Sequence, residues 1–258
     1  MKRTGLQIDL NCDMGEYPDA VADGTQEALM RSVTSVNIAC GGHAGDEGTM
    51  RATIEQALRA GVAIGAHPGY PDRANFGRLE LNLSPQEVAH SVFAQVNALA
   101  QIAAACGARV VHVKPHGALY NQAARNRELA SAIAQGVASW STDVVMVGLA
   151  GSPMLEVFRE AGFAVAGEAF ADRRYEPDGS LRSRKFPDAL ISDPADAAQQ
   201  ALNVVQKSSI IACDSSELRV QAHTICIHGD TPAAPIIAAA VAYTLRKAAI
   251  SLHALSRR

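Results

Sequence analysis

Short apolar runs recur along the chain, and each one gives way abruptly to polar or charged residues. Runs of four or five mostly apolar residues, rich in valine and isoleucine, are typical of buried strands. About seven of them are predicted as strands: Leu6–Leu10, Val36–Ala39, Val62–Ala66, Val110–Val113, Val144–Val147, Val165–Ala169 and Thr224–Ile227. Because these runs are nearly continuous rather than alternating, they favour a parallel sheet that is covered on both faces.

Amphipathic helices are predicted between the strands. Ser84-Pro85-Gln86-Glu87 combines a cap residue, a proline at the first helical position and a glutamate three residues after the cap. Ser152-Pro153 and Asp193-Pro194 begin further helices, and another lies between Asp46 and Gly61. The alternation of strand and helix predicts an α/β fold: a single (β/α) barrel, possibly incomplete, over residues 1–258, with an open doubly wound sheet as the alternative.

One long segment interrupts this alternation. Residues Asp172 to Asp193 are polar and poor in helical pattern, with Pro177-Asp178-Gly179 as a turn. We expect a mobile loop over the mouth of the barrel.

Composition narrows the class of protein. The chain has 258 residues, of which 48% are hydrophobic, enough for one barrel-sized core. A net charge of -3 and an aromatic content of 5% disfavour a nucleic-acid partner. Five cysteines without a Cys-x-x-Cys motif do not indicate a disulfide framework. The N-terminus lacks the apolar stretch of a signal peptide, and the apolar stretch Ala233 to Ala249 is broken by charges. We therefore expect a cytoplasmic protein with no membrane partner.

Candidate chemistry collects where the predicted strands end. If the fold is a barrel, the strand ends bring eight residues to one rim: Asp13, His43, His67, Lys114, His116, Glu168, His228 and Asp230. Active sites of such barrels are built at the C-terminal ends of several strands. A single such residue is as well explained by a helix cap or a structural hydrogen bond, but their coincidence on one rim predicts an enzyme.

Some of these residues suggest particular roles. Asp9, Asn11 and Asp13 alternate along an extended segment, which suits a cation, an ammonium group or a general acid or base; a turn with an Asp cap is the structural alternative. Lys114 directly follows an apolar strand, and charge complementarity to a phosphoryl group or oxyanion is the functional interpretation.

Other residues are candidates for binding an anionic group. Arg78 is a candidate clamp for a carboxylate, with a surface ion pair as the alternative, and Asp172 and Arg173 end a strand where they can pair with each other. His228-Gly229-Asp230 precedes a helix whose free backbone N–H groups would accept phosphate. No Gly-x-x-x-x-Gly-Lys-Ser/Thr loop is present.

Several motifs resemble those of the LamB/YcsF family, in the same order and over nearly the whole chain. The matching segments are Asp9–Glu16, Asn37–Asp46, Gly65–Asp72, His112–Asn121, Ala171–Arg173 and Ile227–Pro232. The resemblance implies a seven-stranded TIM-like (β/α) barrel related to the glycoside hydrolase and deacetylase barrels.

The resemblance also implies an activity. Family members act with two further subunits, PxpB and PxpC, to open 5-oxo-L-proline to L-glutamate while ATP is hydrolysed. On this basis the expected catalytic residues are Asp13, His43, His67, Lys114 and His116. The expected substrate or phosphate ligands are Asn11, Arg78, Glu168, Asp172, Arg173, His228, Gly229 and Asp230.

Two alternatives remain open. A metal-dependent amide or carbohydrate deacetylase would hold a divalent ion with Asp13 and His43 among its ligands. A non-catalytic subunit would only present substrate to its partners. The sequence leaves open whether a metal is bound and which subunit binds ATP.

Overall fold

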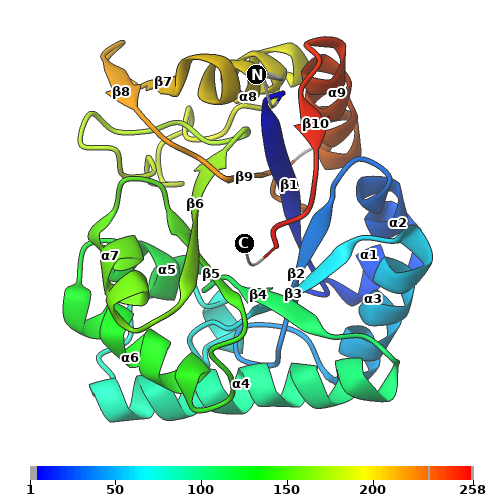
Figure 1. Ribbon diagram of the computed structural model, residues 1–258, viewed down its shortest axis with the longest axis vertical. Helices are drawn as coiled ribbons and strands as arrows, with labels where there is room; N and C mark the ends of the chain where they lie inside the picture. The colour runs from blue at the N-terminus through cyan, green and yellow to red at the C-terminus, as the bar shows by residue number, and fades with distance from the viewer. Residues whose placement is uncertain (1–4, 232, 257–258) are drawn as a thin grey trace.

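Seven parallel strands close into a barrel in the computed structural model, which describes residues 5–231 and 233–256 (Figure 1). The strands are β1 (Gln7–Met14), β2 (Ser35–Ala39), β3 (Ala63–His67), β4 (Val110–Val113), β5 (Val145–Leu149), β6 (Ala164–Phe170) and β9 (Thr224–Cys226). They pair in the order β1-β2-β3-β4-β5-β6-β9, and β9 pairs back onto β1. All seven predicted strands are present, and closure confirms the barrel over the open sheet.

Strand β1 extends further than the sequence predicted. We expected it to end at Leu10, but it continues to Met14 and pairs with β2 in the register Asp13↔Asn37. Its polar residues point into the barrel, where partners from neighbouring strands satisfy them. Asn11, for example, donates to Glu168 and Thr224. The apolar pattern alone predicted too early an end for this strand, because it does not reveal the hydrogen-bond partners that allow buried polar residues to continue it.

Helices surround the barrel (Figure 1). They are α1 (Pro18–Ala22), α2 (Thr25–Met30), α3 (Glu47–Ala60), α4 (Pro85–Ala105), α5 (Gly117–Ala123), α6 (Arg127–Ala138), α7 (Pro153–Glu160), α8 (Pro194–Lys207) and α9 (Ala234–Lys247), with a 3-10 turn at Arg73–Asn75. The predicted starts of α4, α7 and α8 are confirmed. Ser84 and Glu87 form the expected reciprocal capping box.

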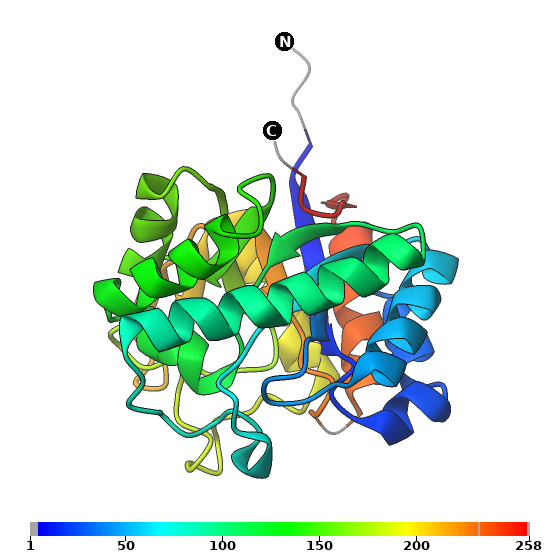
Figure 2. The ribbon, with the colours of Figure 1, turned by 90° about the horizontal axis from the view of Figure 1, so that it is seen from below.

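Helix α4 is unusually long and apolar. Among the described helices it is the one that is long and apolar enough to cross a membrane, judged by length and composition alone. It packs against α6, α3 and the strands β3 and β4. Figure 2 shows it running across the outside of the barrel, so its apolar face is used as barrel packing.

Smaller elements complete the fold. A hairpin of β7 (Ser209–Ile211) and β8 (Glu217–Arg219) stands apart from the barrel, and β10 (Ser251–Leu252) pairs with the start of β1. The polar segment after β6 folds back on itself through isolated bridges, Arg173↔Leu190 and Tyr175↔Leu181. Its position near the mouth is as predicted, whereas its mobility stays a prediction. The five cysteines are free thiols.

Asp9 is a buried carboxyl group that is held by hydroxyl groups. Its side chain accepts hydrogen bonds from the hydroxyls of Thr34, Ser35 and Thr224, and the residue is 1% exposed. Burial outweighs these hydrogen bonds and raises the pKa of Asp9 from 3.8 to about 6. The native state therefore binds this proton more tightly than the unfolded chain does.

This shift predicts how stability changes with pH. Stability contributed by protonated Asp9 is fully present below pH 3.8 and is lost as the pH rises through about 6. The loss amounts to about 3 kcal/mol in the free energy of unfolding. We expect Asp9→Asn to flatten the decline between pH 4 and pH 6.5 in urea unfolding, whereas Glu55→Gln on the exposed surface of α3 should not. Equal slopes for Asp9→Asn and the wild type would contradict the prediction.

Candidate active site

A cavity of about 1020 Å³ opens at the C-terminal ends of the barrel strands. Eight predicted site residues line it: Asp13, His67, Arg78, Lys114, His116, Arg173, His228 and Asp230. The other five lie around it without lining it: Asn11, His43, Glu168, Asp172 and Gly229. Barrel closure therefore brings residues from six strands or their loops to one place, as the sequence predicted.

Lys114 lies at the floor of the cavity and is buried. Its Nζ lies 2.9 Å from Asp13 Oδ1, 3.0 Å from Glu168 Oε1 and 3.1 Å from Cys226 Sγ. Burial lowers the pKa of Lys114, but Asp13, Cys226 and Glu168 outweigh it and hold the pKa well above its usual range. The ammonium group is charged and already has two carboxylate partners. Its predicted role in binding phosphate would require it to leave one of them.

A polar layer under Asp13 fixes its orientation. Asn37 Nδ2 donates to Asp13 Oδ1 at 2.8 Å and to Asn11 Oδ1 at 2.7 Å. His112 Nε2 lies 2.7 Å from Asn37 Oδ1 and holds that amide in place. The imidazole fits because Gly65 has no side chain: a Cβ there would collide with the ring of His112. Asn11 therefore belongs to the hydrogen-bonded layer that holds Asp13, and it does not line the cavity.

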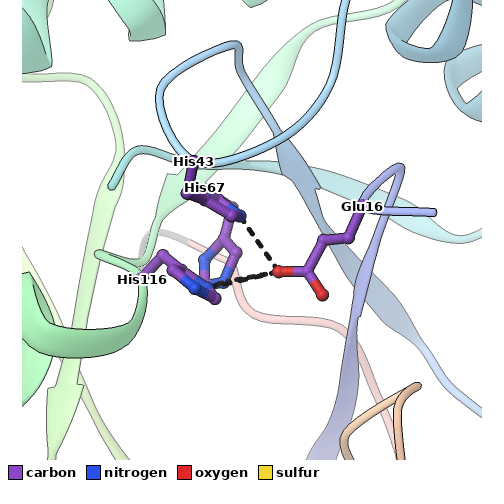
Figure 3. Close-up of side chains that lie close together, drawn as sticks. All are labelled: Glu16, His43, His67 and His116. Carbon is purple, nitrogen blue, oxygen red and sulfur yellow. Dashed lines mark hydrogen bonds and ion pairs between the residues drawn. The ribbon is translucent and has the colours of Figure 1, made fainter. Parts of the chain in front are cut away.

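Three histidines gather around Glu16, as Figure 3 shows. His43 follows β2, His67 ends β3 and His116 precedes α5, while Glu16 follows β1. Glu16 Oε1 lies 3.0 Å from His43 Nε2, 3.2 Å from His116 Nδ1 and 3.9 Å from His67 Nε2. Glu16 is the last residue of the matching segment Asp9–Glu16, but it was not among the expected site residues. Its carboxylate, just beyond the strand end after Gly15, was the available signal.

The protonation of this group follows from burial and hydrogen bonding. Burial lowers the pKa of His43 to about 3 and also lowers the pKa of His116. Burial alone raises the pKa of Glu16, but the neighbouring imidazoles of His116 and His43 outweigh it and hold the pKa well below its usual range. Asp13 behaves in the same way: His67 and Lys114 outweigh burial, and its pKa is held well below the usual range. The site thus presents carboxylates beside two imidazoles, those of His43 and His116, that burial favours in the neutral form.

Arginines also line the cavity. Asp230 accepts from Arg184 at 2.8 Å and from Arg78 at 2.5 Å, so Arg78 is paired within the chain. Arg173 is 6% exposed; its terminal nitrogen donates to Arg182 O at 2.7 Å, but its Nε has no partner within the described residues. Burial and the nearby Arg184 lower the pKa of Arg173 to about 10. The sequence did not single out Arg184, which lies in the irregular loop.

Asp172 organises the loop after β9. It accepts from the backbone N–H of His228 at 3.0 Å and from the hydroxyl of Thr231 at 2.5 Å. The structural alternative, in which Asp172 pairs with Arg173, is therefore not what the structure shows, because the side chain of Asp172 turns toward the His228 loop. A Cβ at Gly229 would lie 3.2 Å from the backbone oxygen of Asp13, and the role of this glycine in phosphate binding stays a prediction. Pro232, which ends one of the matching segments, lies outside the described residues.

Comparisons with known proteins agree with this architecture. Residues 8–258 match the model of the LamB/YcsF family. The chain is 51% identical over 248 residues to the A subunit of 5-oxoprolinase from Chloroflexus aggregans, covering 96% of this chain and 98% of that protein. It is 48% identical over 247 residues to the protein of the same name from Bordetella pertussis, with coverage of 96% and 98%.

Solved structures show the same fold. The lactam utilization protein from Thermus thermophilus superposes with a TM-score of 0.89 at 41% identity, covering 97% of this chain and 100% of that one. A family 4 carbohydrate esterase from Streptomyces lividans, at 13% identity and a TM-score of 0.51, covers 98% of this chain and 94% of that one. At this identity the likeness shows the fold alone.

These names give no support for ATP binding by this chain, which the sequence left open, since they mention a subunit and a lactam but no nucleotide. What the comparisons establish is the family: with a match that begins at residue 8 and runs to the last residue, the chain belongs to the LamB/YcsF family.

Proposed function

We propose that the chain is the A subunit of a multi-subunit, ATP-hydrolysing 5-oxoprolinase. Its cavity holds 5-oxo-L-proline while the C–N bond of the lactam is hydrolysed to give L-glutamate. The observation that carries the proposal is the 51% identity to a relative named as the A subunit of 5-oxoprolinase, over 98% of that relative's length. The chemistry of the cavity supports it independently.

The substrate carries one carboxylate and one polar amide, and the cavity offers a partner for each. Arg173 lines the cavity with a largely buried guanidinium that has no carboxylate ion pair within the described residues, so it is suited to a carboxylate. The lactam end would then face Asp13 and the histidines. A cavity of about 1020 Å³ exceeds what a single five-membered ring needs, so it leaves room for an activated group or for part of a partner subunit.

A stable lactam requires activation before water can open it. In the proposed route the γ-phosphoryl group of ATP is transferred to the amide oxygen and ADP leaves. Water adds to the activated carbon, the C–N bond breaks as the amine takes a proton, and a second water releases phosphate from the acyl phosphate. Asp13, which lines the cavity with Oδ2 3.3 Å from His67 Nε2, accepts the proton of the attacking water.

The nucleotide is assigned to the partners. The chain has no Gly-x-x-x-x-Gly-Lys-Ser/Thr loop, so we propose that PxpB- and PxpC-like subunits bind ATP and deliver the phosphoryl group to this cavity. We place the assembled enzyme in the cytoplasm, where ATP is present and the free thiols stay reduced.

The test is glutamate release from 5-oxoproline and ATP, first with this chain alone and then with both partner subunits. We expect glutamate and ADP in equal amounts, and only in the mixture. Absence of glutamate in every combination, with the complex confirmed by gel filtration, would contradict the proposal. Acetate release from an N-acetylated sugar under the same conditions would favour the deacetylase alternative.

One variant separates catalysis from mere presentation of substrate. Asp13→Asn in an intact complex should lose activity if this chain carries the reaction. Glu55→Gln, on the exposed face of α3, is the matched control and should retain it. Full activity of Asp13→Asn would instead identify a non-catalytic binding subunit.

A further inference from the structure

His67 and His116 face each other in an arrangement that neutral imidazoles alone do not satisfy. His67 Nδ1 lies 2.8 Å from the backbone oxygen of Lys114, and His116 Nε2 lies 3.0 Å from that of Phe76. A carbonyl oxygen only accepts, so each of these outer nitrogens carries the ring proton. The inner nitrogens, His67 Nε2 and His116 Nδ1, therefore both present lone pairs, yet they lie 2.9 Å apart.

Glu16 adds a third electron-pair donor to the same point. Its Oε1 lies 3.2 Å from His116 Nδ1 and 3.9 Å from His67 Nε2. Ligand atoms bound tetrahedrally at 2.0–2.1 Å from a zinc ion are about 3.3–3.4 Å apart. The three separations lie on both sides of this value. Three lone pairs directed at one point call for a positive charge between them.

From this geometry we propose that Glu16, His67 and His116 bind a divalent cation of the zinc class. Two histidines and a glutamate form a ligand set known from catalytic zinc sites, which keep a position open for water or substrate. All three residues line the cavity, so the open position faces it. The outer N–H of each imidazole is held by a backbone carbonyl, as is usual for metal-ligating histidines.

His43 belongs to the group but is not a ligand in this arrangement. Its ring stacks on that of His116 with centroids 3.6 Å apart and planes inclined by 3°. An ion lies in the plane of an imidazole that binds it, and two parallel rings at this separation do not share such a point. His43 does not line the cavity. Its Nε2, 3.0 Å from Glu16 Oε1, instead orients the carboxylate.

A second cluster of possible ligands does not compete. Asp13, Cys226 and His228 also lie near one another. The Lys114 ammonium, however, lies 2.9 Å from Asp13 Oδ1 and 3.1 Å from Cys226 Sγ, and it occupies the place that a cation would take. Asp13 Oδ2, 3.3 Å from His67 Nε2, is then placed to accept a hydrogen bond from a water on the proposed ion.

The proposal concerns ion binding and does not depend on the lactam reaction. The full chain would be stripped with a chelator, incubated with Zn²⁺ or Co²⁺ alone, desalted and analysed by elemental mass spectrometry. We expect about one ion per chain, and visible ligand-field absorption for Co²⁺. Glu16→Gln, His67→Ala and His116→Ala should reduce uptake to background, whereas His90→Ala on the exposed face of α4 should not.

Two further measurements keep the outcome decisive if a variant unfolds. X-ray absorption of the Zn²⁺-loaded wild type should show two imidazoles and a carboxylate around the ion. His43→Asn should keep the stoichiometry with an affinity lowered about 10–100-fold. No uptake by the wild type would mean that a proton lies between the imidazoles and would overturn the proposal. Ion binding without glutamate release would reject the proposed function and leave this site standing.

Discussion

Lys114→Met is expected to lower the free energy of unfolding by about 3–5 kcal/mol, because it leaves buried carboxylates without their cation. Asp13 is 7% exposed and Glu168 is fully buried, and both contact the Lys114 ammonium within 3.0 Å. Methionine matches the volume of the lysine stem, so the loss isolates charge rather than packing. The measurement is urea unfolding followed by circular dichroism.

Neutralising the partners should restore much of this loss. Combining Lys114→Met with Asp13→Asn and Glu168→Gln removes the uncompensated charges, and the triple variant should be more stable than the single one. Lys207→Met, at the exposed end of α8, is the matched control and should change stability by no more than about 0.5 kcal/mol. If the triple variant is no more stable than Lys114→Met, the role assigned to charge compensation is wrong.

The barrel and its rim could be predicted because their signals are local. Buried strands are marked by apolar runs, and the start of α4 is marked by Ser84, Pro85 and Glu87 within four consecutive residues. Polar residues directly after such runs must meet at one end of a parallel barrel. Asp13, His67, Lys114 and His116 reached the cavity on that argument alone.

The partners of these residues could not be predicted because they depend on three-dimensional closure. Glu16 contacts three histidines that lie at or after the ends of β2, β3 and β4, 27 or more residues away in sequence. From the sequence, Asp172 could have paired with its neighbour Arg173, but it hydrogen-bonds the backbone of His228, 56 residues along the chain. Arg184 lies in a loop without periodicity, so no pattern distinguished it from Arg182 or Lys185. Spacing predicts which strand end a residue occupies, but it does not determine which atom it contacts.

Arg173→Met is expected to raise the KM of the assembled enzyme for 5-oxoproline by about 30–1000-fold, equivalent to about 2–4 kcal/mol of lost carboxylate binding. The guanidinium lines the cavity and has no carboxylate ion pair within the described residues, so the substrate carboxylate would supply the opposite charge. Arg174→Met is the matched control: the neighbouring arginine is exposed and does not line the cavity. The measurement is glutamate release over a range of substrate concentrations.

Stability separates this role from a structural one. A buried guanidinium that serves only the fold would cost several kcal/mol on removal, as for Lys114. Arg173 has one hydrogen bond to Arg182 O, and burial together with Arg184 holds its pKa near 10, below the usual value of 12.5. Without substrate its burial is poorly compensated, so Arg173→Met should change the free energy of unfolding by no more than about 1 kcal/mol. A raised KM with unchanged stability identifies a binding residue; a large loss of stability with unchanged KM would identify a structural one.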